Sequence, residues 1–289
     1  MSHPSTPEAM NYPSAPEAMG YPSAPETQPP RPSGALLRRI LTWTAAALLF
    51  TGTATGIGYA LTHTERSDLP LLATESDGRW DYPGLKLPAL PHGAPAPLDD
   101  KANPAGIHHV TDLRRLLLPQ PAGAKPDTDA AAAKIKDGWI SPADFTAVYA
   151  KDEREAVRQM LTDDAVRHVA ARAWTMPDGT RTGIYLLRFN TGALAGHFYD
   201  EVLTGGVSAG RELAEAPNTV LDESWPTKAR LDGVDLYVYD EEKPYGATHA
   251  RQAYVVAGDT IALVVQSRAG GAAKVPFQQT LALQQQLLG

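Results

Sequence analysis

The sequence predicts an α+β fold, an antiparallel sheet with helices on one face, preceded by a disordered tail, one transmembrane helix and a proline-rich stalk. Two observations separate these parts. Prolines cluster in residues 1–32 and again in residues 70–104, and the 22 residues 40–61 carry no charge. A third defines the folded domain, since from residue 110 onward apolar residues recur with the periods of helices and strands. We therefore divide the chain into residues 1–39, 40–61, 62–109 and 110–289.

The tail, residues 1–39, is built on a nine-residue unit written three times: PSTPEAMNY, PSAPEAMGY and PSAPETQPP. A repeat so rich in proline cannot bury a core, and we expect it to be disordered. Each unit contains Pro-x-x-Pro, which favours polyproline II and fits an aromatic groove. Two interpretations stand: a cytoplasmic partner binds the tail, or, as we favour, the repeats arose by duplication and have no partner.

Residues 40–61, ILTWTAAALLFTGTATGIGYAL, form the expected transmembrane helix. At ~1.5 Å per residue they span about 33 Å, enough for a hydrocarbon core of ~30 Å. Trp43 and Tyr59 lie near the two ends, where interfacial aromatic residues occur. A cleaved signal peptide would have a shorter apolar region, and a soluble core helix would carry charges on one face. We favour an uncleaved anchor over both alternatives.

Arg38 and Arg39 precede this helix directly and, by the positive-inside tendency, place the N-terminus in the cytoplasm and residues 62–289 outside. Within the helix, Gly52 and Gly56 form a GxxxG motif, whose small residues let two helices approach closely in lipid. The motif predicts a homodimer through this helix. The alternative is that glycine is simply frequent in transmembrane helices.

Residues 62–109 are expected to be an extracytoplasmic stalk. Their closely spaced prolines, as in DYPGLKLPALPHGAPAPLDDKANPAG, exclude helix and sheet interiors and favour an extended chain. Leu85, Leu87 and Leu90 are too apolar for a free linker. We therefore expect part of this segment to pack along the C-terminal domain.

The first half of the domain predicts helices followed by a hairpin. DLRRLLLP gives a short helical turn, and Ser141-Pro142 is typical of the start of a helix, here over residues 142–161 and broken near Lys151. Pro177-Asp178-Gly179 is a turn between two strand-like runs, the second of which, residues 184–189, reads as a central strand.

The second half of the domain repeats this order. Thr191 caps a helix that Gly205-Gly206 ends. Residues 234–239 alternate as a strand, and two further runs form a hairpin about Ala257-Gly258-Asp259. Pro276 opens a final helix. The order helices, β-β-α, then β-β-β-α indicates one antiparallel sheet with helices packed on a face.

The hairpin YVVAGDTIALVV (Tyr254–Val265), the closing helix and the order of parts resemble the extracellular sensor domain of mycobacterial PknH-type kinases and related lipoproteins. The layout is similar to that of other membrane-anchored extracytoplasmic proteins of actinobacteria. The resemblance covers residues 110–289, without a diagnostic motif, and implies a twisted sheet with a groove that binds a ligand. The chain departs from the family because no kinase precedes the helix and the sensor domain's cysteines are missing.

Composition excludes several classes of function. The chain has no cysteine, which excludes disulfides, zinc–thiolate sites and thiol nucleophiles. The net charge is −7, and a phosphate-backbone partner needs a basic face, so we expect no nucleic acid. His108-His109 with Asp112 lacks the paired spacing of a metal site. We interpret these histidines as solvated linker residues and expect no metal or cofactor.

Gly206-Val207-Ser208-Ala209-Gly210 matches GxSxG, the nucleophile elbow of α/β-hydrolases. That elbow requires a strand before the serine, whereas the preceding ALAGHFYDEVLTG is helical in pattern. A triad of Ser208, Asp240 and His249 can still be written in the expected chain order. A cell-envelope serine hydrolase is therefore the alternative function, although we favour a glycine-rich loop after a helix.

Trp139, Trp225 and Tyr245 lie beside Gly or Pro in expected loops, where large amphipathic side chains serve as binding contacts. The interpretation we favour is that they plug the core beneath those loops. The leading hypothesis is a single-pass membrane protein, not an enzyme, whose outside domain binds a ligand or protein of the cell envelope. A passive structural or assembly factor of the envelope is the third hypothesis.

Overall fold

The computed structural model describes residues 76–110, 112–202, 208–226 and 230–289. The predicted transmembrane helix, with Gly52 and Gly56, lies outside these residues, as does the predicted helix end at Gly205-Gly206. Among the described residues, no helix combines the length and apolar character needed to cross a bilayer. The elements are η2 (Leu113–Leu116), β1 (Lys125–Pro126), η3 (Ala132–Lys134), β2 (Trp139–Ile140), α2 (Pro142–Phe145), η4 (Thr146–Val148), α3 (Arg154–Asp163), β3 (His168–Thr175), β4 (Arg181–Arg188), α4 (Gly192–Val202), β5 (Thr219–Leu221), β6 (Asp235–Glu241), β7 (His249–Ala257), β8 (Thr260–Arg268) and α5 (Lys274–Leu288).

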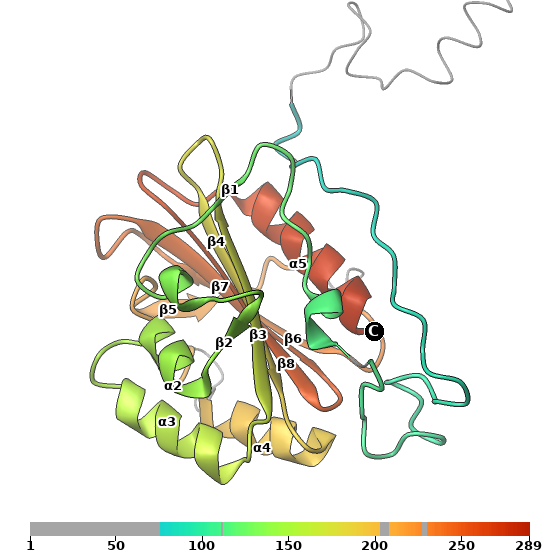
Figure 1. The fold of residues 1–289 in the computed structure, drawn as a ribbon. Helices are drawn as coiled ribbons and strands as arrows, with labels where there is room; N and C mark the ends of the chain where they lie inside the picture. Colours follow the sequence, from blue (N-terminus) through green and yellow to red (C-terminus); the bar gives the residue numbers. More distant parts are fainter. Residues whose placement is uncertain (1–75, 111, 203–207, 227–229) are drawn as a thin grey trace, which may run out of the picture. The chain divides into compact units, whose positions relative to one another are not determined.

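The strands form one eight-stranded sheet in the order β1-β3-β4-β8-β7-β6-β5, with β2 also paired to β3, and every pairing is antiparallel. The α+β class and the antiparallel sheet are therefore confirmed. Both predicted hairpins are present: β3 pairs with β4 across the turn at residues 177–179, and β7 pairs with β8 across Gly258. Because β4 also pairs with β8, the two hairpins lie side by side in the middle of the sheet (Figure 1).

Helices cover both faces of this sheet. Successive residues of β8 point to opposite sides. Leu263 and Val265 belong to the core beneath α2, α3 and α4, whereas Ala262 and Val264 belong to the core beneath α5 (Figure 1). The prediction of helices on one face is therefore wrong. The physical reason is that central strands such as β4 and β8 are apolar on both sides and need cover on both.

The predicted helix over residues 142–161 is present with its interruption. It is divided into α2, the 3-10 turn η4 and α3, with residues 149–153 between them. The Ser141 hydroxyl accepts a hydrogen bond from the Asp144 backbone N at 3.0 Å, which caps α2 as expected. Thr191 caps α4 in the same way, its Oγ1 lying 3.3 Å from the Leu194 backbone N.

The described part of the predicted stalk packs on the domain instead of standing free. Trp80, Tyr82, Leu85 and Leu98 contact the core beneath α5. The main chain of Trp80 makes two 2.8 Å hydrogen bonds to the Gln279 side chain on α5. Apolar contact and paired backbone groups together hold residues 80–98 in place. Leu87 and Leu90, by contrast, are 63% and 40% exposed.

Candidate functional site at Arg181

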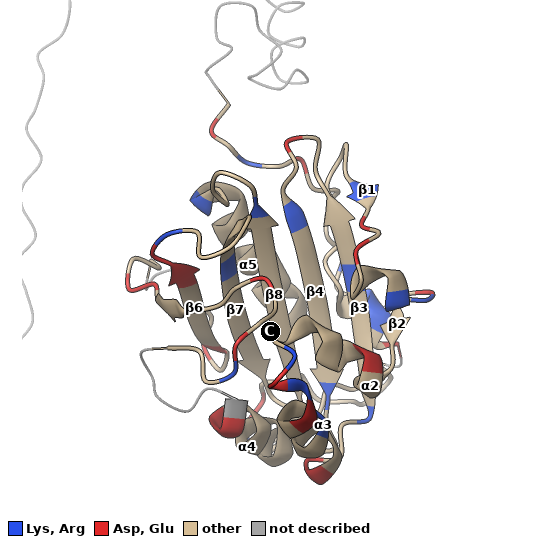
Figure 2. Ribbon diagram, turned by 90° about the vertical axis from the view of Figure 1, so that its left-hand side faces the viewer, with Lys and Arg blue, Asp and Glu red and all other residues tan. Residues whose placement is uncertain are grey.

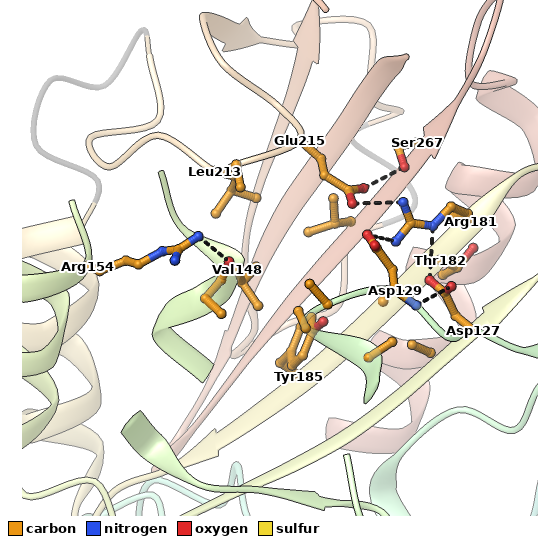
Figure 3. A pocket seen from close by; sticks show the side chains of 18 residues that line it. Asp127, Asp129, Val148, Arg154, Arg181, Thr182, Tyr185, Leu213, Glu215 and Ser267 are labelled. Carbon is orange, nitrogen blue, oxygen red and sulfur yellow. Dashed lines mark hydrogen bonds and ion pairs between the residues drawn. The ribbon is translucent and has the colours of Figure 1, made fainter. Parts of the chain in front are cut away.

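A cavity of about 160 Å³ lies on the α3 and α4 side of the sheet. Its lining comes from distant parts of the chain: residues 127–132, residues 147–148, residues 213–215, and facing positions of β4 and β8 (Figure 3). The lining is apolar toward the sheet, where Tyr185 and Val265 lie, and Val148 and Leu213 add apolar walls.

Alternation along β4 places Arg181, Gly183 and Tyr185 on one face of the sheet. Gly183 makes room for the Tyr185 ring, because a Cβ at that position would come within 3.0 Å of the Tyr185 Cε2 atom. The Tyr185 ring is buried against Phe145, with ring centroids 5.4 Å apart. The sequence of β4 thus places the Tyr185 ring in the cavity wall next to the Arg181 guanidinium.

Three carboxylates surround the Arg181 guanidinium. Its Nε donates to Asp127 Oδ2 at 3.0 Å, and its Nη1 lies 2.9 Å from Glu215 Oε1. Asp129 also accepts a hydrogen bond from Arg181. The Asp127 carboxylate is the most buried of the three, with 10% of its side chain exposed against 44% for Asp129. A guanidinium fork can satisfy several carboxylate oxygens at once, so Arg181 joins two separate loops to the first residue of β4.

The pKa values of Asp129 and Glu215 are shifted in opposite directions. Burial raises the pKa of Glu215, a shift that the hydrogen bond from Ser267 Oγ to Glu215 Oε2 at 2.7 Å partly opposes. The hydrogen bond with Glu215 is the main cause that lowers the pKa of Asp129. These opposite directions make Glu215 the more readily protonated of the two carboxyl groups. Three carboxyl groups around one guanidinium make this end of the cavity acidic.

Arg154 lies at the opposite end of the cavity from Arg181 (Figure 3). Its guanidinium donates to the backbone carbonyl oxygens of Tyr149, at 3.0 Å, and Ala147, at 3.3 Å. These bonds tie the start of α3 to η4. The cavity therefore has an acidic end at Arg181, an apolar middle and, at the other end, Arg154, whose N–H groups donate to backbone carbonyl oxygens.

The three aromatic residues proposed as binding contacts lie in three separate places. Trp139 is half-buried on β2, with the Arg114 guanidinium carbon 5.3 Å from its ring centroid. Trp225 is only 6% exposed and belongs to the core beneath α5. Tyr245 lies in the loop between β6 and β7, 43% exposed, with Lys243 Nζ 5.5 Å from its ring centroid. None of the three lines the Arg181 cavity.

The residues of the alternative hydrolase triad are held in other contacts. Ser208 is exposed and bridges to Val220 of β5, which pairs in turn with Asp240 of β6. The His249 Nε2 faces the Glu241 carbonyl oxygen at 2.9 Å, and its Nδ1 accepts from the Ala272 backbone N at 3.2 Å. Both ring nitrogens are therefore engaged by the main chain. Among the described residues, the geometry offers Ser208 no catalytic base.

His108 is buried, so its interpretation as a solvated linker residue is wrong. Only 2% of the residue is exposed, and its ring contacts the Asp259 carboxylate and the Leu288 carbonyl oxygen. The physical reason is that residues 105–110 pack against the β7–β8 turn, which sequence spacing did not indicate. His109 is half-buried. No cluster of three or more potential metal ligands occurs among the residues described.

No protein-family model matches the chain, and no curated protein matches it. Among solved structures, the extracellular domain of PknH from Mycobacterium tuberculosis is similar, with 12% sequence identity and a TM-score of 0.30. The match covers 50% of this chain and 74% of that one. It agrees with the resemblance in layout noted from the sequence. A likeness of this size carries no argument about the function of this chain.

The sequence reasoning did not find the cavity or its charged residues. Asp127 and Asp129 stand two apart after a proline, and Arg181 begins an apolar strand, which are the signals available in the sequence. Nothing in the local pattern around Glu215 connects it to either. The pairing of β3 with both β1 and β4 brings Asp127 and Asp129 to Arg181. The return of residues 213–215 over β4 and β8 brings Glu215 there.

Proposed function

We propose that the chain is a membrane-anchored, extracytoplasmic binding protein without catalytic activity, whose folded domain binds a small ligand in the Arg181 cavity. The observation that carries the proposal is the Asp129–Glu215 carboxyl pair beside an apolar cavity. Ionisable groups whose pKa values are shifted beside a cavity are common at functional sites. The anchor and the outside location rest on the uncharged residues 40–61 and on Arg38-Arg39.

The chemistry of the cavity favours a small amine with an apolar body. An ammonium group can bind the carboxylates of Asp129 and Glu215 together. The apolar part of the ligand then contacts Val148, Leu213 and Val265. The cavity volume is below the ~300–1,000 Å³ of pockets for drug-sized ligands, which favours a ligand of few heavy atoms.

Calorimetric titration of the full chain in detergent with short branched alkylamines, and with the matching alcohols as neutral analogues, tests this proposal. We expect the amines to bind more tightly than the alcohols, because only the amines supply a charge-assisted hydrogen bond. Glu215→Gln is expected to weaken amine binding about tenfold, which corresponds to about 1.4 kcal/mol. Glu212→Gln, an exposed neighbour, serves as the matched control and should leave binding unchanged.

The affinity for amines is also expected to rise with pH. Because the pKa of Glu215 is raised by burial, its proton competes with the ligand at low pH and is released as the pH rises through that pKa. Glu215→Gln should remove this dependence. Equal binding of amines and alcohols, or an affinity that Glu215→Gln leaves unchanged, would overturn the proposal.

The remaining parts of the chain support two further proposals about partners. Gly52 and Gly56 favour a homodimer through the anchor, and the Pro-x-x-Pro units offer a ligand to a cytoplasmic partner. If the domain signals, a change in dimer geometry across the helix is the expected route. If the partner of the folded domain is an envelope protein and not a small ligand, it would have to contact the domain outside the Arg181 cavity.

A further inference from the structure

Two adjoining hollows lie at the start of β3, at the opposite end of that strand from Thr175, which pairs with Arg181. The larger, of about 460 Å³, is lined by Lys134, Lys136, Trp139, Arg167 and His168 among others. The smaller, of about 240 Å³, shares Arg167 and His168 with it and adds His109 and Arg188. We call the two together the basic recess. The two hollows adjoin at Arg167 and His168, which line both.

Positive charge dominates this recess although the chain as a whole is acidic. The chain has 33 acidic against 26 basic residues. In the recess, by contrast, the lining residues include two lysines, two arginines and one carboxylate, Asp144. Asp144 Oδ2 already accepts a hydrogen bond from Ser141 Oγ at 2.7 Å. Lysine and arginine residues gather at the β2 end of the sheet in Figure 2.

Three of these cations have no counter-ion among the described residues. Arg188 binds Asp259 at 3.3 Å, but Lys134, Lys136 and Arg167 make no ion pair with a described carboxylate. All three are exposed. Elsewhere in the domain, arginines such as Arg211 and Arg251 lie within 2.9 Å of an acidic side chain. Several exposed cations that line one hollow create a local positive potential, which attracts an anion.

Aromatic surface accompanies the charge. Trp139 is half-buried in the wall of the larger hollow, and its ring centroid lies 5.7 Å from that of the exposed His168. β2 pairs Trp139 with Ala170 of β3, which fixes the indole at the sheet edge. The aromatic ring can pack against the apolar face of a sugar ring. The neighbouring cations can bind the acidic substituent of the same sugar.

We propose that the basic recess binds an anionic polysaccharide whose carboxylate or phosphate groups contact Lys134, Lys136 and Arg167 while a sugar ring packs on Trp139. The two adjoining open hollows suit a linear polymer that passes over the surface. The basic recess shares no lining residue with the Arg181 cavity. An isolated Trp is a better partner for a sugar than for a run of stacked bases, which need successive aromatic platforms.

Titration calorimetry on the full chain tests the proposal with four polyanions: an oligogalacturonate, a glycerol-phosphate teichoic acid, inorganic polyphosphate and single-stranded DNA. The oligogalacturonate supplies carboxylates and the teichoic acid supplies phosphates, so the two distinguish the source of the charge. We expect at least one of these two glycans to bind more tightly than polyphosphate and DNA. Trp139→Leu should weaken glycan binding severalfold.

Two triple variants provide the matched comparison. The recess variant combines Lys134→Ala, Lys136→Ala and Arg167→Ala. The control variant combines Arg115→Ala, Lys125→Ala and Lys151→Ala, three exposed cations that do not line the recess. Both remove three positive charges, so a difference between them reports position and not net charge. We expect at least a tenfold loss of glycan affinity in the recess variant and less than a twofold change in the control.

Three results would overturn the proposal. The first is that neither glycan binds the full chain. The second is that both triple variants lose affinity equally. The third is that DNA or polyphosphate binds as tightly as the better glycan, since attraction to any polyanion would then account for the data. Failure here leaves the amine-binding proposal untouched, because Glu215→Gln and the recess variant change different surfaces.

Discussion

His108 lies between two acceptors in the buried interior. Its Nδ1 is 2.9 Å from Asp259 Oδ1, and its Nε2 is 2.8 Å from the Leu288 carbonyl oxygen. Because a carbonyl oxygen only accepts, Nε2 must donate to Leu288. Arg188 binds the second oxygen of Asp259 at 3.3 Å. These contacts join residues 105–110, the β7–β8 turn and the C-terminal end of α5.

Replacing His108 by Ala is expected to lower the free energy of unfolding by about 3 kcal/mol, since it removes the hydrogen bonds of the imidazole to the buried Asp259 carboxylate and to the Leu288 carbonyl oxygen. Urea denaturation followed by circular dichroism measures this change. His109→Ala is the matched control: that neighbour is half-buried and makes no side-chain hydrogen bond to a described residue, so we expect about 0.5 kcal/mol or less. A loss below about 1 kcal/mol in the His108 variant would contradict the stabilising role of these buried hydrogen bonds.

The same contacts fix the sign of the pH dependence at Asp259. Burial alone would raise the pKa of Asp259, but the hydrogen bond from His108 and the charge of Arg188 outweigh it and lower the pKa below the usual 3.8. A carboxyl whose pKa is lowered on folding stabilises the fold above its unfolded pKa. This contribution is lost as the pH falls through the lowered value. Acid unfolding of His108→Ala should therefore begin at a higher pH than that of the parent chain.

At the scale of elements, the two hairpins and the long helices could be predicted because their signals are local. Pro177-Asp178-Gly179 and the run about Gly258 are turn sequences between apolar strands. β1, β2 and β5 are only two or three residues long, and strands of that length show no alternation to recognise. Packing of part of residues 62–109 on the domain was expected from the leucines, but of these only Leu85 contacts the core, whereas Leu87 and Leu90 are exposed.

The attachment of residues 80–98 to α5 gives a prediction for that element. Gln279→Ala removes both hydrogen bonds to the Trp80 main chain, so we expect faster tryptic cleavage after Arg79 and Lys86. Limited proteolysis followed by mass spectrometry measures the two rates. Gln278→Ala serves as the control, since the Gln278 side chain makes no hydrogen bond to the described residues. Equal rates in the two variants would show that Gln279 does not hold this segment.

At the scale of the whole molecule, the candidate site exists only because of the sheet order. Asp127 and Asp129 follow β1 at one edge, Arg181 begins β4, and Glu215 arrives by a loop after α4. The contact between Gly106 and Gly258 also joins residues that are far apart in the sequence. Their backbones approach so closely that a Cβ on Gly258 would overlap the Gly106 carbonyl oxygen. Fold class follows from local periodicity, whereas sites made by distant loops depend on tertiary pairing that one sequence does not display.

Methyl NMR of the full chain, labelled at leucine and valine, tests most directly whether the Arg181 cavity binds a ligand. On titration with the tightest-binding amine, the methyl signals of Val148, Leu213 and Val265 are predicted to shift, because these residues line the cavity. Val264, the neighbour of Val265 that faces α5, and Leu186 on the same side as Val264 should stay unchanged. Shifts at Val264 and Leu186 without shifts at the three lining residues would contradict the account.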